Sequence, residues 1–304
     1  MRTIYFFCCI LFTAWCLTGC QKGVTDISTA NLVIKFKFDS NQVRLDNIGQ
    51  PATVAAGHGA QNPVFNSMSA HYIELAPSAL TALGTGDIVY QSPETTAGGD
   101  KAINFAQSNF AGNGEVFCKI PITSIRPGSY EWLRMSLSYQ NADVKFYIDT
   151  VVAGIPVKQE FPGTIAGFIG FNTYINTLTI NNQSLLINAN KLQGFWGFET
   201  DINYNGVNFP FITSGQAPPG ATTVPNPLFA TSPIPAGSCV VTAAFVPGPL
   251  TITGIETEDI VIEVSLSTNK SFEWNEVVAD GKWEPSKGET VQDMGIRGMI
   301  PTIQ

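Results

Sequence analysis

The chain has 304 residues, of which 44% are hydrophobic, 11% aromatic and only 13% charged. This composition excludes a coiled coil, which needs charge-rich heptads, and argues against a disordered chain, which would lack so many aromatic residues. The formal net charge of −8 argues against a nucleic-acid partner, because such binding needs a basic face.

The N-terminus carries the most specific motif. Arg2 precedes the apolar run 4–16, which is too short to span a bilayer but has the length of a signal-peptide core. Leu17-Thr18-Gly19-Cys20 follows directly and resembles the lipobox of bacterial lipoproteins, in particular those of the Bacteroidota envelope. The resemblance implies a signal peptide over 1–19, attachment of diacylglycerol and acyl chains at Cys20, and a lipid anchor in the outer membrane, with the leaflet left open.

Two regions follow the expected cleavage point. Residues 20–30 are mostly small and polar and predict a tether between the bilayer and a folded ectodomain over 31–304. We expect this ectodomain to be a single elaborated domain or two packed sandwiches that meet near 149–163.

Short apolar runs separated by turn residues indicate an all-β ectodomain, an antiparallel β-sandwich. Asn205-Gly206 between two such runs predicts a two-residue hairpin, and 77–83 predicts the one short helix. The predicted strands are 32–38, 70–75, 87–91, 102–105, 116–122, 130–139, 144–150, 158–161, 165–171, 177–180, 185–187, 202–204, 207–212, 239–246 and 260–266.

Cysteine usage after the lipobox allows one pairing. Cys118 and Cys239 are the only cysteines beyond Cys20, and in an oxidising compartment they are a candidate disulfide. The alternative is two separate buried cysteines that act as small hydrophobes.

A partial calcium motif lies near the predicted hairpin. Asp201, Asn203 and Asn205 match the first half of a D-x-N-x-N-G loop, whose oxygens can converge on one cation. The twelfth position is Ile212 instead of glutamate, and a hairpin with Asn205 at its tip explains the same residues.

The C-terminal segment interleaves acids with two tryptophans. Paired carboxylates beside tryptophans can cleave a glycosidic bond, one as proton donor and the other as nucleophile or base. The alternative is a solvated hairpin with acids outward and tryptophans inward. The residues are Glu273, Glu276, Asp280, Glu284, Glu289, Asp293, Trp274 and Trp283.

The chain has two histidines. His71 shares a strand face with Ile73 and Leu75, which favours a core histidine, whereas His58 lies in a glycine-flanked loop and is free to ligate a metal or be solvated. The strand 32–38, Tyr72-Ile73 and the run 126–134, with its Pro-Gly-x-Tyr turn, are similar to the copper-binding MbnP-like family. This similarity implies a copper-binding module, but no copper ligand position matches.

No G-x-S-x-G, H-E-x-x-H or P-loop motif occurs. We therefore expect no enzymatic activity and no cofactor. The favoured function is a lipid-anchored, non-enzymatic β-sandwich that binds a ligand or an envelope partner. The alternatives are a periplasmic copper-binding module and a carbohydrate-active enzyme that uses the C-terminal acids.

Overall fold

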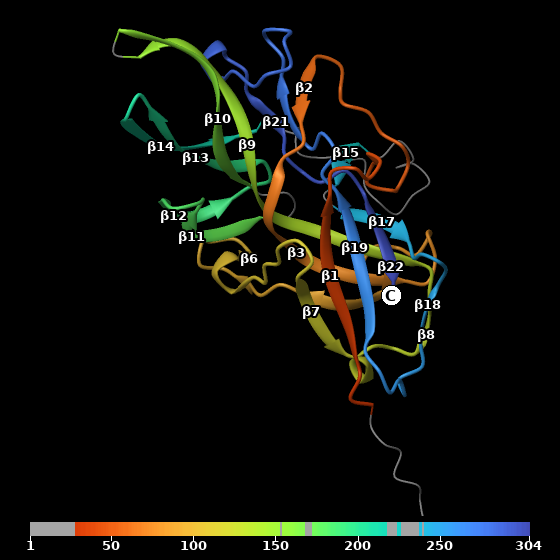
Figure 1. The fold of residues 1–304 in the computed structure, drawn as a ribbon. Helices are drawn as coiled ribbons and strands as arrows, with labels where there is room; N and C mark the ends of the chain where they lie inside the picture. Colours follow the sequence, from red (N-terminus) through yellow and green to blue (C-terminus); the bar gives the residue numbers. More distant parts are fainter. Residues whose placement is uncertain (1–27, 153, 168–171, 218–223, 226–236, 239) are drawn as a thin grey trace, which may run out of the picture.

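The computed structural model describes residues 28–152, 154–167, 172–217, 224–225, 237–238 and 240–304 (Figure 1). Regular structure in these ranges consists of strands and three single-turn 3-10 helices, so the predicted all-β fold is confirmed. In the part of the chain described, no helix is long and apolar enough to cross a membrane.

One sheet has the strand order β22-β19-β1-β7. Its members are β1 (Asn31–Asp39), β7 (Val116–Pro121), β19 (Ile260–Ser267) and β22 (Met299–Ile303). β1 pairs antiparallel with β7 but parallel with β19, so the sandwich is not purely antiparallel. The predicted strands 32–38 and 260–266 therefore lie side by side at the centre of this sheet.

The larger sheet has the order β14-β13-β10-β9-β3-β4, and β17 also pairs with β9. It curls along its length, so that its two outer hairpins, β9–β10 and β13–β14, bend away from the sandwich (Figure 1). Its strands are β3 (Val64–Ala76), β4 (Asp87–Gln91), β9 (Trp132–Val152), β10 (Ile155–Gly167), β13 (Phe195–Tyr204), β14 (Val207–Gln216) and β17 (Val240–Ala244).

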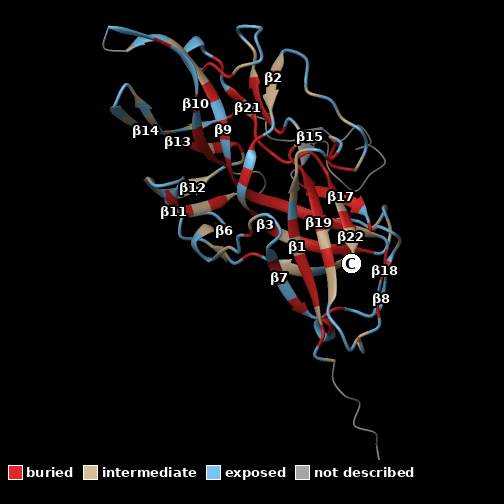
Figure 2. Ribbon diagram, viewed as in Figure 1, coloured by how far each residue is buried: buried red, intermediate tan, exposed pale blue. Residues whose placement is uncertain are grey.

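The main core lies between these two sheets (Figure 2). Leu32, Ile34 and Phe36 of β1 meet Leu133 and Met135 of β9, and none of the five is accessible to solvent. Burial of five such side chains contributes roughly 1.5–3 kcal/mol each before the entropy of ordering is subtracted. This core fixes the sandwich from which the outer hairpins extend.

Smaller sheets complete the fold. They comprise β2 (His58–Gln61), β20 (Phe272–Asn275) and β21 (Val291–Asp293); β5 (Glu94–Thr95), β6 (Ala102–Asn104), β11 (Thr173–Thr179) and β12 (Ser184–Lys191); β8 (Gly128–Tyr130) with β18 (Leu250–Ile252); and β15 (Val224–Pro225) with β16 (Gly237–Ser238).

The predicted junction near 149–163 is the end of a hairpin. β9 continues without interruption to Val152 and returns as β10, paired from Ile155 to Gly167. The same strand supplies Leu133 to the main core and Phe146 to a second apolar cluster. Residues 149–163 are therefore not a boundary between two sandwiches.

The short helix predicted over 77–83 is wrong. These residues form bends and turns over a buried ion pair between Glu74 and Arg134. The Gly86 N–H donates to Glu74 at 2.6 Å, and Arg134 donates to the Ala82 carbonyl at 3.4 Å. The two buried charged side chains hydrogen-bond to backbone N–H and C=O groups of this loop. In a helix, such groups would instead hydrogen-bond to one another.

Candidate functional site

The hairpins β9–β10 and β13–β14 of the large sheet separate from each other (Figure 1). Side chains of both hairpins line a cavity, the aromatic cleft. β10 pairs with β13 only from Thr164 opposite Glu199 to Gly167 opposite Trp196. Beyond this short ladder, the described residues of β10 pair only with β9, and those of β13 only with β14.

Pro162 marks the point where the ladder stops. The Thr200 hydroxyl donates to the Pro162 carbonyl at 2.7 Å, so this carbonyl faces β13. The N–H and C=O of a strand residue point to the same side, and proline has no N–H to offer there. The ladder therefore loses a donor at the position where the strands part.

Most of the cleft lining comes from one face of four strands, β9, β10, β13 and β14. Alternation along β13 places Trp196, Phe198, Ile202 and Tyr204 on this face, because successive strand residues point to opposite sides. The cavity has a volume of about 540 Å³. The other lining residues are Phe146, Tyr147, Ile148, Thr150, Val157, Phe161, Thr200, Phe209, Pro210, Phe211, Thr213, Trp283, Pro285 and Ser286.

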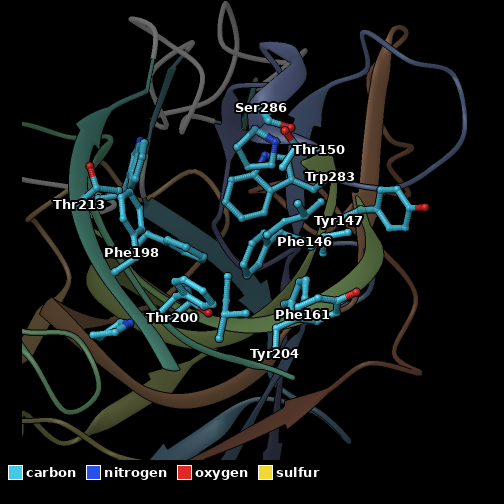
Figure 3. Close-up of a pocket in the computed structure, with 18 residues that line it drawn as sticks. Phe146, Tyr147, Thr150, Phe161, Phe198, Thr200, Tyr204, Thr213, Trp283 and Ser286 are labelled. Atoms are coloured by element: carbon cyan, nitrogen blue, oxygen red, sulfur yellow. The ribbon is translucent and has the colours of Figure 1, made fainter. Parts of the chain in front are cut away.

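Trp283 closes one side of the cleft and packs edge-on against its aromatic wall (Figure 3). Its ring centroid lies 5.5 Å from that of Phe198 and 6.4 Å from that of Phe146. The indole N–H donates to the Glu289 carbonyl at 3.2 Å, and the Trp283 carbonyl accepts from the Tyr147 N–H at 2.7 Å. The cleft wall is thus held in place by hydrogen bonds outside the cavity.

Two glycines let aromatic rings lie flat against the sheet. A Cβ atom added at Gly163 would lie 2.4 Å from the ring of Phe198, and one at Gly215 would lie 2.4 Å from the ring of Trp196. Neither position could carry a side chain without displacing a ring that lines the cavity. Gly163 and Gly215 therefore keep the cleft open.

The lining is apolar in chemistry. No charged side chain occurs among the described residues that line the cavity, and its polar groups are hydroxyls and indoles. Its volume is within the range of small-molecule sites, roughly 300–1,000 Å³. Phe211, which also lines the cavity, is 52% exposed.

Where β10 and β13 separate, the face of the sheet opposite the aromatic cleft is acidic. Asp143, Glu199 and Asp201 line a second cavity of about 200 Å³, which shares Thr200 with the aromatic cleft. Glu199 accepts from backbone N–H groups in the β11–β12 turn, including that of Gln183 at 2.9 Å. No basic residue is among the described residues that line this acidic notch.

The calcium motif is a hairpin. Asn205 and Gly206 have φ of 52° and 78°, as a type I′ turn needs, and Tyr204 pairs with Val207. Asp201 and Asn203 are exposed on β13, about 6.6 Å apart along the strand. The three oxygens of Asp201, Asn203 and Asn205 therefore do not converge in a cation loop.

The C-terminal acid Glu273 is the centre of a buried charge network. It is paired with Arg44, lies 2.9 Å from Arg297 Nη2 and 2.8 Å from His58 Nδ1. Burial would raise the pKa of Glu273, but the attraction of Arg297, the hydrogen bond from His58 and the Arg44 guanidinium outweigh it and lower this pKa to about 2. Glu273 is therefore a fixed anion in a structural network.

Glu276, Glu289 and Asp293 also hold neighbouring groups in place. Glu289 accepts from the N–H groups of Val277 and Glu284, Glu276 accepts from that of Gly281, and Asp293 pairs with Arg297 at 2.8 Å. Trp274 and Trp283 point inward as the hairpin alternative expected, but Glu273, Glu284, Glu289 and Asp293 are buried instead of solvated.

The two histidines lie in different hydrogen-bonded settings. His71 is buried and its Nε2 lies 3.0 Å from Glu94, so the core-histidine interpretation is confirmed. His58 begins β2 and contacts Glu273, instead of lying in a free loop. Across the described ranges, no three His, Cys, Asp or Glu side chains are grouped so that they could hold a metal ion.

Cys118 is buried and forms no disulfide with another described residue, and burial raises the pKa of its thiol to about 12. Cys20 and Cys239 lie outside the described residues, so lipidation and the pairing of Cys118 with Cys239 stay predictions. The Pro-Gly-x-Tyr turn forms β8, where the Tyr130 hydroxyl donates to the Arg126 carbonyl at 2.6 Å.

The aromatic cleft itself was not predicted. Its signal in the sequence is the aromatic alternation of 196–211, which continues on both sides of the Asn205-Gly206 turn. The contributions of Phe146, Phe161 and Trp283 come from distant segments and no local pattern joins them. No family model, no curated protein and no solved structure matches the chain.

Proposed function

We propose that the protein is a lipid-anchored, non-enzymatic binding protein of the bacterial cell envelope whose aromatic cleft takes up an uncharged, apolar group. The observation that carries this proposal is the cleft itself. Two of its aromatic rings pack against glycines, and no charged side chain is among its described lining residues. A cavity of about 540 Å³ buries enough apolar surface to hold such a group.

The polarity of the cleft favours an apolar ligand over a sugar. Thr150, Thr200, Thr213 and Ser286 are the aliphatic hydroxyls that line it, and Thr200 already donates to Pro162. A buried sugar hydroxyl without a partner costs about 1–3 kcal/mol, and a sugar carries several. Glu273, Glu276, Glu289 and Asp293 hold backbone groups or buried arginines, so their contacts give no support to glycosidase chemistry at these four acids.

The position of the cleft is compatible with an N-terminal anchor. The chain enters β1 at Asn31 at one end of the molecule, whereas hairpins β9–β10 and β13–β14 lie at the other end (Figure 1). A lipid at Cys20 joined through the tether 20–30 would leave the cleft facing away from the attachment point. In this arrangement the ligand reaches the cleft from the side opposite the anchor.

Titration with N-phenyl-1-naphthylamine, an uncharged apolar fluorophore, tests the proposal. The protein without residues 1–19 retains every described element and is the protein titrated. We expect saturable binding in the micromolar range. Ile202→Lys places a charge in the cleft and should weaken binding at least about tenfold, since a buried unpaired charge is strongly unfavourable.

Leu186→Lys is the matched control, because Leu186 is 80% exposed on β12, away from the cleft. It should bind the fluorophore like the unchanged protein. Absence of saturable binding, or equal weakening by both lysine substitutions, would contradict the proposed function.

A further inference from the structure

We propose that the apolar group belongs to a peptide segment of a partner protein, which enters the cleft as an added β-strand between β10 and β13. The partner segment alternates apolar and basic side chains. This inference rests on the proposed function and names the kind of ligand that the aromatic cleft takes up. Three observations carry it. Two strand edges are unpaired, the opening between them has two chemically different faces, and prolines limit the pairing of one edge.

The β10 edge presents backbone groups to the cleft. The carbonyls of Pro156 and Pro162 both face β13, because they accept from the Tyr204 and Thr200 hydroxyls at 3.3 Å and 2.7 Å. Strand alternation then directs the N–H and C=O groups of Lys158 and Glu160 to the same side. In the described ladder these two residues have no β13 partner.

The β13 edge faces them. Tyr204 and Val207 close a two-residue hairpin, a position at which both residues exchange backbone hydrogen bonds within the hairpin. The backbone groups of Asp201 and Asn203 therefore point the other way, toward β10. Their only described ladder partners are on the β14 side, so the two edges confront each other across the cleft.

A lipid chain or a fused ring could fill the aromatic cleft but could not use these edges. An extended peptide can hydrogen-bond to exposed strand edges and insert alternate side chains into pockets. Pro156 and Pro162 have no N–H, and edge prolines limit strand pairing. Pairing along β10 is therefore confined to a short segment around Lys158 and Glu160.

The two faces of the opening set the side-chain pattern. Alternate side chains of an inserted strand point to opposite faces, so one set would enter the aromatic cleft and the other would meet the acidic notch. The notch is lined by Asp143, Glu199 and Asp201. Lys145, opposite Pro162 on β9, and Lys158 on β10 are already paired with Glu160 and Asp149. The notch therefore stays acidic and favours basic side chains.

Four heptapeptides test the proposal by calorimetric titration of the protein without residues 1–19. The first is acetyl-Lys-Leu-Lys-Ile-Lys-Leu-Lys-amide. The second has the same composition with the leucines and isoleucine adjacent, and the third is the first with its three central backbone nitrogens methylated. The fourth replaces every lysine by glutamate. Displacement of N-phenyl-1-naphthylamine by each peptide is measured in parallel.

The first peptide should bind at least about tenfold tighter than the other three, since these lose the register, the backbone donors or the charge match. It should also displace the fluorophore. Fluorophore binding with no preference among the four peptides, or undiminished binding of the N-methylated one, would overturn strand addition while the proposed function stands. Failure of the fluorophore to bind would overturn the proposed function as well.

Discussion

The size of the aromatic cleft depends on single residues beneath its rings. Gly163→Ala would put a methyl group 2.4 Å from the ring of Phe198, which must then move toward the cavity. We expect a loss of about 1–3 kcal/mol in the free energy of unfolding, as for other overpacked positions, and weaker fluorophore binding. Denaturant unfolding and fluorophore titration measure the two effects.

Gly248→Ala is the control for this substitution, because a Cβ atom at Gly248 meets nothing within 4 Å. It should change neither quantity. If Gly163→Ala binds the fluorophore as well as the unchanged protein does, Phe198 does not define the cavity.

Glu273 makes the stability of the protein sensitive to acid. Its pKa falls from an ordinary 4.5 to about 2 in the folded state. A depressed carboxyl pKa means that the unfolded chain binds more protons, so the stabilisation is complete above about pH 4.5 and is lost as the pH falls toward 2. Urea unfolding at a series of pH values should show this decline.

Glu273→Gln should flatten the decline in the free energy of unfolding between pH 4.5 and 2. At neutral pH it should lower the free energy of unfolding by about 3–5 kcal/mol, because Arg297 and Arg44 stay buried without the Glu273 carboxylate. Burial raises the pKa of Asp293, so protonation of Asp293 favours the folded state as the pH falls, opposite to the effect of Glu273. This contribution of Asp293 is present in both proteins. Glu263→Gln on the surface is the control. Parallel pH profiles for the unchanged protein and Glu273→Gln would contradict this account.

The sequence predicted residue environments where a local pattern decided them. His71 is buried because its strand face is apolar, and Trp274 and Trp283 are inside because they are large and apolar. The burial of Glu273 could not be predicted, since its partners Arg44 and His58 come from the opposite end of the chain. Charge networks of this kind depend on tertiary contacts.

At the scale of elements, the β13–β14 hairpin depends on its turn. Asn205 and Gly206 both have positive φ, which costs a residue with a Cβ atom about 1–2 kcal/mol. Gly206→Ala should therefore destabilise this hairpin and speed amide exchange in β13 and β14, while exchange in β1 and β19 stays unchanged. Uniform loss of protection in all four strands would show that the hairpin does not open by itself.

Strands were predictable where alternation is regular. β1, β4, β7 and β19 were expected close to their observed limits. β9 was expected as two strands, because 140–143 is mostly polar. The structure buries Asn141 there, and its side chain donates to the Ile180 carbonyl at 2.6 Å.

On the scale of the whole molecule, the topology depends on long-range pairing. β1 pairs in parallel with β19 more than two hundred residues later, and no local pattern specifies that partner. The cleft has the same origin, because β9, β13 and the segment at Trp283 meet only through the tertiary fold. The all-β class was therefore predictable, whereas the strand order and the binding site were not.

The proposed lipid anchor is also tested at the scale of the whole molecule. Cys20→Ala should give unprocessed or soluble protein, because the lipid at Cys20 is the proposed attachment to the membrane. Fractionation with a carbonate wash measures this, and the unchanged protein should stay with the outer membrane. A Cys20→Ala protein that remains in the washed outer membrane would contradict the lipid anchor.

Nuclear magnetic resonance of the tryptophan indoles tests the central proposal, apolar binding in the cleft, most directly. Trp196 and Trp283 line the cleft, whereas Trp132 begins β9 at the other end of that strand. Titration with N-phenyl-1-naphthylamine should shift the indole N–H signals of Trp196 and Trp283 along a saturable curve and leave that of Trp132 in place. Fluorophore binding that leaves both cleft indoles unchanged would contradict the proposal.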